Sequence, residues 1–169
     1  MIALRPLSSS DAGELFRLLA GSNVVDTLVY DEPESEAELE TSLESRQEMA
    51  EAGLLRSFTI RELATGAVIG SIRLKYDLRL ERGEIGLWLG RQFQGRGYGS
   101  EAIGQVTEQG FRDLGLKRIE AQIFVGNAAS RKAFENNGFA LERTERSAIL
   151  KQGRYQDVWY LSAYRQPNF

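Results

Sequence analysis

The sequence predicts a mixed α/β fold, in which helices cover both faces of a central sheet, from three observations. Helical and strand-like segments follow one another in the order β-α-α-β-β-β-α-β-α-β-β, so helices fall between groups of strands. Two pairs of strand-like segments are joined by short glycine-containing turns, as in antiparallel hairpins. The 169 residues are 42% hydrophobic and 27% charged, as in a globular protein, and we expect one domain over 1–169.

Local signals define each element of the N-terminal half. We expect a strand at 2–7, helices at 8–20 and 34–52, and strands at 54–63 and 68–76. Pro6 ends the first strand, and Asp11 and Glu14 have the spacing of a capping box in the first helix. Gly53 stops the second helix, and the turn "ATGA" joins the two following strands into a hairpin.

The C-terminal half continues the same alternation. We expect a strand at 83–90, a helix at 99–115, a strand at 117–125, a helix at 127–139 and strands at 140–150 and 157–164. Ile103, Val106 and Phe111 recur at helical spacing. Gly138 followed by Phe139 suits a Schellman cap in which the phenylalanine packs back on its helix. The turn "KQGR" then closes an antiparallel hairpin.

The composition excludes several kinds of chemistry. The chain has no cysteine and no histidine, which rules out disulfides, Cys/His zinc sites, a thiol nucleophile and an imidazole base. We expect no metal site. A net charge of −3 disfavours nucleic acid as a partner. The apolar runs are too short to span a membrane, and the start lacks the layout of a signal peptide, so we expect a cytoplasmic protein.

Acidic residues gather in one stretch of the chain, where Arg46 is the single base. The stretch is either the solvated face of a surface helix or an acidic lip that attracts a cationic substrate. The residues are Asp26, Asp31, Glu32, Glu34, Glu36, Glu38, Glu40, Glu44, Glu48 and Glu51.

A glycine-rich loop, "RQFQGRGYGSEAI" at 91–103, stands directly before a predicted helix. Helix starts expose backbone N–H groups and the positive end of the dipole, so the loop suits a phosphate unless it is empty. The chain contains no P-loop string. A dinucleotide fingerprint is formally present from Gly97 to Ala102, with Glu120 further on, but "RQFQGR" separates it from the preceding strand. The third match is Q-x-x-G-x-G, through Gln94, Gly97 and Gly99.

This third string resembles the pyrophosphate-binding motif of the GNAT superfamily of N-acetyltransferases, and it lies between a fourth strand and a third helix, as in that family. The resemblance extends over nearly the whole chain. It is strongest for the RimJ/RimL-like branch, which acetylates the N-terminal amines of ribosomal proteins and has relatives that acetylate small amines. The segments that carry it are "GEIGLWLGRQFQGRGYGSEAI", "KRIEAQIFVGNAASRKAFENNGFALE" and "KQGRYQDVWYLS".

The resemblance implies a GNAT acyl-CoA N-acyltransferase fold whose sheet splays apart between strands 4 and 5, with acetyl-CoA as cosubstrate in the opening. Backbone groups of Leu87, Trp88 and Leu89 would pair with the pantetheine arm. Arg91 and Arg96 would add charge-assisted contacts or remain solvated. The implied pyrophosphate loop comprises Gln94, Gly95, Arg96, Gly97, Tyr98, Gly99 and Ser100.

The segment after the fifth strand matches the family's N-x-x-S pattern. Asn127 is a good helix N-cap, and the match implies that it also contacts the cofactor. The match also implies that the Ser130 hydroxyl would stabilise the departing thiolate. Many members of the family carry a tyrosine seven residues after this asparagine, which acts as the general acid, but here the position is Phe134. The general acid is therefore Ser130, another tyrosine or water.

Glu84 is the leading candidate for the general base. Deprotonating an α-amine of pKa about 8 at neutral pH costs about 1 kcal/mol, whereas a lysine amine of pKa about 10.4 costs about 5 kcal/mol. Strand alternation puts Glu84 on one face with Gly86 and Trp88, and the branch commonly carries an acid here. Glu84 would act directly or through a water, unless it is an exposed strand-end residue.

The acceptor amine is a protein N-terminus or a small molecule. The resemblance to the family implies that two pairs of residues lie around the acceptor cleft, namely Tyr30 and Asp31, and Tyr155 and Asp157. The preference of aspartate for turns would alone explain Asp157. Edge strands and the closing hairpin would allow a homodimer. The alternative function is a catalytically inactive acyl-CoA sensor, which the replacement by Phe134 keeps open.

Overall fold

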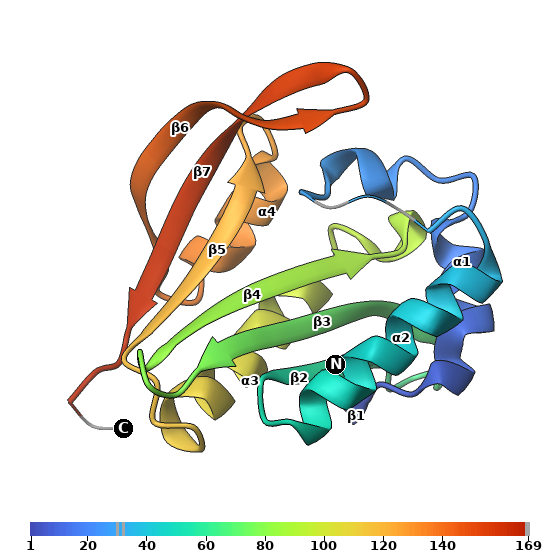
Figure 1. Ribbon diagram of the computed structural model, residues 1–169, viewed down its shortest axis with the longest axis horizontal. Coiled ribbons are helices and arrows are strands. Elements are labelled where there is room, and N and C mark those ends of the chain that lie inside the picture. Colours follow the sequence, from blue (N-terminus) through green and yellow to red (C-terminus); the bar gives the residue numbers. More distant parts are fainter. Residues whose placement is uncertain (30, 32, 168–169) are drawn as a thin grey trace.

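The computed structural model describes residues 1–29, 31 and 33–167, and a seven-stranded sheet in the order β1-β2-β3-β4-β5-β7-β6 forms its centre (Figure 1). Every neighbouring pair is antiparallel except β4 and β5, which are parallel. The predicted mixed sheet is confirmed. The strands are β1 (Ile2–Pro6), β2 (Leu55–Glu62), β3 (Val68–Asp77), β4 (Arg82–Leu89), β5 (Arg118–Phe124), β6 (Ala140–Lys151) and β7 (Arg154–Tyr164).

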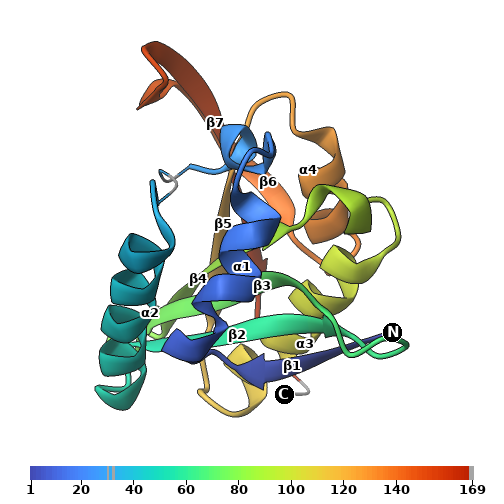
Figure 2. The ribbon, with the colours of Figure 1, turned by 90° about the vertical axis from the view of Figure 1, so that its right-hand side faces the viewer.

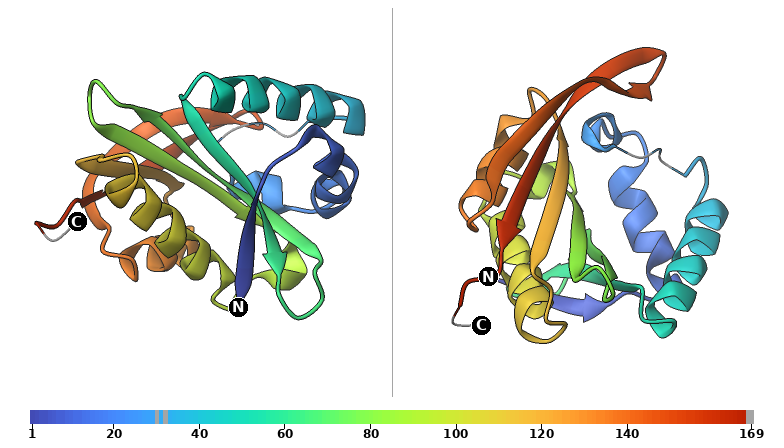
Figure 3. Two further views of the ribbon diagram at one scale, coloured as in Figure 1. Left: turned by 90° about the horizontal axis from the view of Figure 1, so that it is seen from below. Right: turned by 60° about the vertical axis from the view of Figure 1, so that its left-hand side comes forward.

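Helices cover both faces of the sheet (Figure 2). The α-helices are α1 (Ala12–Leu19), α2 (Glu36–Glu51), α3 (Tyr98–Arg112) and α4 (Ala128–Glu135), and the 3-10 turns are η1 (Ser9–Asp11), η2 (Val24–Thr27) and η3 (Arg91–Phe93). The helices α1 and α2 pack on one face of the β1–β4 half, whereas α3 and α4 pack on the opposite face of the sheet, α4 against β5. On the α1–α2 side, no helix of the described residues covers β5, β7 and β6 (Figure 3).

Two apolar layers hold the helices to the sheet. The layer under α3 contains fully buried side chains such as Ile72, Ile103 and Ile119. The layer under α1 and α2 is built around Leu15 and Leu43. Each such side chain stabilises the fold by about 1.5–3 kcal/mol when it is fully buried.

The caps of the helices confirm one prediction and correct another. The Schellman cap after α4 is present, since Gly138 has φ 84° and the Phe139 N–H donates to the Phe134 carbonyl over 3.3 Å. The capping box lies one turn earlier than predicted, because a 3-10 turn precedes α1. Ser8 and Asp11 form the box on η1, whereas Asp11 makes no side-chain cap bond to α1.

The sheet splays between β4 and β5, as predicted. The two strands pair only from Arg82 to Glu84 on β4, opposite Arg118 to Glu120 on β5. Beyond that point β4 continues beside β3 and β5 continues beside β7, so the two halves of the sheet diverge (Figure 1). The edge of β4 that faces β5 is therefore open from residue 85 to residue 89.

Candidate functional site

A cavity of about 500 Å³ occupies the space between the diverging strands. Most of the residues predicted for the acyl donor line it, namely Leu87, Trp88, Leu89, Gln94, Gly95, Gly97, Gly99, Ser100, Asn127 and Ser130. Its walls also include residues that the sequence did not suggest: Val24, Thr27, Leu28 and Val29 before α2, Gln122 and Ile123 on β5, and Lys132 and Asn136 around α4. Of the predicted set, Arg96 and Tyr98 are not part of the lining.

The open edge of β4 presents backbone groups of alternate residues to the gap. The Gly90 N–H donates to the Ile69 carbonyl on β3 over 2.8 Å, so by strand alternation the backbone of Trp88 also faces β3. A Cβ at Gly70 would lie 2.2 Å from the Trp88 carbonyl oxygen, which places that carbonyl on the same side. The prediction for Trp88 is corrected accordingly: the residue lines the cavity, but its backbone groups pair with β3, and only those of Leu87 and Leu89 face the gap.

Gln94, the first residue of the predicted motif, holds the start of the glycine loop to the strand. Its Nε2 donates to the Leu89 carbonyl over 3.0 Å. This bond uses one acceptor of the open β4 edge. The Leu89 N–H and both backbone groups of Leu87 remain directed at the gap.

The glycine loop itself has an open, left-handed backbone. Gly95 and Gly97 have φ of 73° and 82°, and a Cβ at either position would meet no other heavy atom within 4 Å. Gly97 is the N-cap of α3, so the loop ends at the positive pole of a 15-residue helix. A glycine loop in this position suits a phosphate.

Side chains around the loop point in different directions. Arg91 is exposed. Arg96 lies 3.9 Å from Glu62 on β2, and the Tyr98 hydroxyl donates to the same carboxylate. Asn137 donates to both the carbonyl and the hydroxyl of Ser100, over 2.9 and 3.1 Å, and so ties the first turn of α3 to the end of α4.

Helix α4 brings a hydroxyl near its start and an aromatic ring near its end to the cavity. The Asn127 Oδ1 accepts the Ser130 N–H over 3.2 Å, so the structural role predicted for Asn127 as an N-cap is confirmed. The half-buried Ser130 lies on the cavity wall. Phe134 also lines the cavity and packs edge-on against Phe139, with ring centroids 5.0 Å apart.

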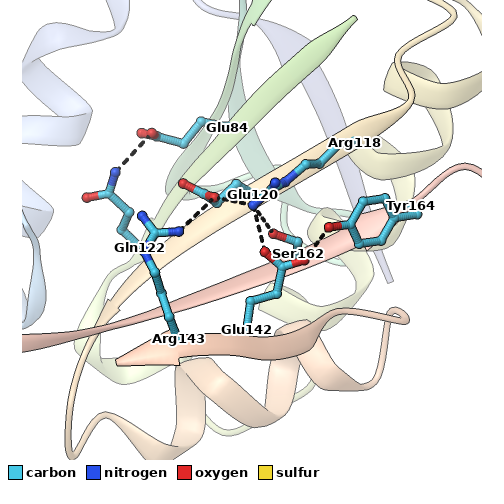
Figure 4. A network of polar contacts seen from close by, with 8 residues as sticks. All are labelled: Glu84, Arg118, Glu120, Gln122, Glu142, Arg143, Ser162 and Tyr164. Carbon is cyan, nitrogen blue, oxygen red and sulfur yellow. Dashed lines mark hydrogen bonds and ion pairs between the residues drawn. The ribbon is translucent and has the colours of Figure 1, made fainter. Parts of the chain in front are cut away.

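Glu84 stands at the last paired position of β4, where the splay begins. Gln122 on β5 donates through Nε2 to the Glu84 Oε2 over 3.2 Å (Figure 4). Glu84 lines a second cavity of about 380 Å³ beside the end of α2, whereas Gln122 lines the larger one. The pair therefore lies at the boundary between the two cavities.

A polar network extends from this boundary over the open face of β5, β7 and β6 (Figure 4). Arg118 contacts Glu120 at 2.8 Å, Glu142 at 2.7 Å and the Ser162 hydroxyl at 3.1 Å. The Tyr164 hydroxyl donates to Glu142, and this bond, helped by Arg118, lowers the pKa of the Glu142 carboxyl. Among the described residues Glu84 forms no ion pair, which distinguishes it from these neutralised carboxylates.

The described residues of those predicted for the acceptor cleft lie on the β6–β7 hairpin or in contact with it. Tyr30 lies outside the described residues. Asp31 pairs with Lys151 of the β6–β7 hairpin at 3.2 Å. Asp157 accepts the Ser147 N–H over 2.8 Å at a bulge of β6, and Tyr155 is 68% exposed. Neither Tyr155 nor Asp157 lines a cavity described above.

Three further observations complete the description of the chain. No group of three or more metal-ligating side chains occurs within residues 1–29, 31 and 33–167. In the same part of the chain no helix is long and apolar enough to cross a membrane. The formal dinucleotide fingerprint lies eight residues beyond β4 in a largely antiparallel sheet, which is not the setting that such a fingerprint requires.

Comparison with known proteins agrees with this architecture. A profile of the acetyltransferase (GNAT) domain matches residues 2–140. The uncharacterized N-acetyltransferase p20 of Bacillus licheniformis is 34% identical over 115 residues, an alignment that spans 68% of this chain and 65%, just under two thirds, of that protein.

Solved structures share the fold over nearly the full length. The ribosomal-protein-S5-alanine acetyltransferase of Vibrio fischeri superposes with a TM-score of 0.86 at 19% identity, covering 98% of this chain and 94% of that one. The spermidine N-acetyltransferase of Vibrio cholerae, solved with CoA and spermine, has a TM-score of 0.85 at 23% identity, covering 97% and 95%. With the domain match and the splayed sheet, the predicted family is confirmed: this chain belongs to the GNAT family of acetyltransferases.

Proposed function

We propose that the protein is an acetyl-CoA-dependent N-acetyltransferase that moves the acetyl group directly from the thioester to a primary amine. The observation that carries the proposal is the cavity between β4 and β5, which joins an open strand edge to a glycine loop at a helix N-terminus. The edge suits the amides of the pantetheine arm, and the loop suits the pyrophosphate.

The transfer needs no covalent enzyme intermediate, and the chain has no cysteine to form one. The amine nitrogen attacks the thioester carbonyl, the C–N bond forms, and the C–S bond breaks to release CoA. A backbone N–H of Leu87 or Leu89 stabilises the oxyanion. Glu84 takes the proton of the amine, directly or through a water, because its carboxylate accepts one amide bond and no cation. Ser130 or water protonates the thiolate, since Phe134 has no proton to give.

The acceptor is a primary amine, either a protein N-terminus or a small molecule. The proteins with a similar fold include a ribosomal-protein-S5-alanine acetyltransferase and a spermidine N-acetyltransferase. We infer that this chain also acetylates an amine. An α-amine requires only a modest base, such as a half-buried glutamate. The acidic stretch on α2 and before it favours a cationic acceptor.

The second candidate is an acyl-CoA-binding sensor without catalysis. This candidate is favoured by Phe134, which replaces the tyrosine that acts as general acid in many members of the family. The residue is 3% exposed, and its ring packs on Phe139. This candidate predicts binding of acetyl-CoA without turnover for any amine.

A thiol assay separates the two candidates. Acetyl-CoA and a panel of amines (a peptide with a free N-terminus, spermidine and single amino acids) are incubated with the protein, and released CoA is titrated with a thiol reagent. The chain has no cysteine, so the signal has no protein background. Amine-dependent release establishes the transferase. Binding without release for the whole panel supports the sensor.

A further inference from the structure

The far side of the glycine loop, away from the cavity, carries a cluster that the proposed chemistry does not use. Tyr98, the first residue of α3, donates its hydroxyl to the Oε1 of Glu62 over 2.6 Å. The Arg96 guanidinium lies 3.9 Å from the same oxygen. Both side chains thus leave the loop on the side of β2, although their backbones belong to the loop.

Glu62 itself is firmly held. It is the last residue of β2, and its side chain is 12% exposed. The Thr65 hydroxyl donates to the Oε2 over 2.8 Å and in turn accepts the Ala67 N–H over 3.2 Å. The carboxylate is therefore fixed by the turn that joins β2 to β3, which is part of the sheet and independent of the loop.

The hydrogen bond between Tyr98 and Glu62 is charge-assisted at neutral pH. It is the main cause that lowers the pKa of the Glu62 carboxyl and raises the pKa of the Tyr98 phenol, so the acid is ionised and the phenol is protonated. Bonds of this type are shorter and stronger than those between neutral groups.

The loop depends on such anchors because its glycines provide none. A Cβ built at Gly95 or Gly97 would meet no heavy atom within 4 Å, so no side-chain packing at these two positions holds the loop. Gln94 fixes the start of the loop to β4 over 3.0 Å. At the other end, the side chains that follow the two glycines are held by Glu62.

We propose that Glu62 is a positioning residue for the CoA pyrophosphate: by holding Tyr98 and Arg96 from the β2–β3 turn, it sets the direction of the loop N–H groups from Gly95 to Ser100. The residue does not touch the ligand. This inference rests on the proposed function, since it concerns binding of acetyl-CoA by the same loop.

The test compares two ligands and four variants by calorimetric titration. S-acetylpantetheine carries the thioester arm of acetyl-CoA but lacks its pyrophosphate. We expect Glu62→Ala to weaken acetyl-CoA binding about tenfold and Tyr98→Phe about fivefold, less than the full value of a charge-assisted bond because neither change removes a contact with the ligand. Binding of S-acetylpantetheine should stay within about twofold of wild type, because this ligand has no pyrophosphate for the loop to contact.

Two further variants serve as rescue and control. Glu62→Gln keeps an oxygen that accepts the Tyr98 hydroxyl, and should bind acetyl-CoA within about twofold of wild type. Glu101 lies in the first turn of the same helix, but its carboxylate accepts the Ile2 N–H of β1 over 3.1 Å. Glu101→Gln makes the same charge change without touching the loop anchors, and should leave acetyl-CoA binding unchanged.

The inference is overturned if Glu62→Ala and Tyr98→Phe both bind acetyl-CoA like wild type. It is also overturned if they lose both ligands equally, because that pattern indicates general destabilisation. Tyr98→Phe removes a single oxygen atom, so it keeps the test valid if Glu62→Ala does not fold. Failure of the wild-type protein to bind acetyl-CoA would instead refute the proposed function.

Discussion

The two sides of the larger cavity are built in different ways. The side formed by β4, the glycine loop and α4 consists of backbone at the ends of regular elements, locked by short local bonds such as Gln94 to Leu89 and Asn127 to Ser130. The opposite side includes Val24, Thr27, Leu28 and Val29, which precede α2. The β6–β7 hairpin does not line the cavity but contacts this part of the chain, more than 100 residues away, through Gln152 with Asp26 and Lys151 with Asp31.

This difference suits a division of labour between the two substrates. A side made of backbone groups recognises a constant ligand, and in the proposed function that ligand is the arm and pyrophosphate of CoA. A side made of exchangeable side chains on loops accommodates different acceptors. Variants on the first side should therefore change donor binding, and variants on the second should change the acceptor.

The largest effect is expected at Glu84, at the boundary between the larger cavity and the second one. Glu84→Gln removes the proposed base, so kcat should fall about 100-fold, the lower end of the range for general base catalysis. The affinity for acetyl-CoA should stay within about twofold. The measurement is the pH profile of CoA release from pH 6 to 9, in which the defect should shrink as the amine deprotonates by itself. Equal turnover by the variant and the wild type at every pH would remove Glu84 from the mechanism.

On the donor side, Gly97→Ala should weaken acetyl-CoA binding about tenfold. Its φ of 82° lies in the left-handed region, where a side chain costs about 1–2 kcal/mol, so the loop relaxes away from its binding geometry. Gly53, after α2, is a matched control, since its φ is 71° and a Cβ there also meets no heavy atom within 4 Å. Gly53→Ala should lower the stability by a similar amount and leave binding intact, and equal binding losses in the two variants would contradict the assignment of the loop.

A smaller effect concerns the cap of α4. Asn127→Ala should lower the free energy of unfolding by about 1 kcal/mol, because the Ser130 N–H loses its partner. Asn127→Asp keeps an acceptor at the same place and should restore most of that stability in urea denaturation. If Asn127→Asp matches the wild type in stability but loses acetyl-CoA affinity, Asn127 also contacts the cofactor through its amide nitrogen.

The smallest effect is expected on the acceptor side. Gln152→Ala removes the 2.7 Å bond to Asp26, which is exposed and therefore worth little. We expect the KM for the amine to change about twofold with no change in the KM for acetyl-CoA. A change in the acetyl-CoA KM instead would show that the hairpin belongs to the donor side.

The features that could be predicted from the sequence are those set by neighbouring residues, as on the donor side of the cavity. The strands, the helices, the Schellman cap at Gly138 and the glycine loop depend on signals within a few neighbouring residues, and these are present in the structure. The capping box was misplaced because a 3-10 turn and an α-helix share the signal around Asp11. The backbone of Trp88 was assigned to the gap because one sequence does not show which side of a strand is already paired.

Contacts between segments that are distant in the chain could not be predicted from the sequence. The polar alternation of Arg118, Glu120 and Gln122 marks a face of β5, but only the register of β4 against β5 brings Gln122 to Glu84. Nothing local connects Glu62 with Tyr98, which lie 36 residues apart. Residues 24–29 carry no motif, and their place in the cavity wall depends on how α1 packs on the sheet.

The central claim is that the cavity between β4 and β5 binds acetyl-CoA, and the melting temperature of the protein with and without this ligand tests it most directly. Acetyl-CoA at about 100 times its dissociation constant stabilises the folded state by about 2.7 kcal/mol, a shift of several degrees at this size. We expect that shift with acetyl-CoA and none with NAD at the same concentration. An unchanged melting temperature with acetyl-CoA, or an equal shift with NAD, would contradict the claim.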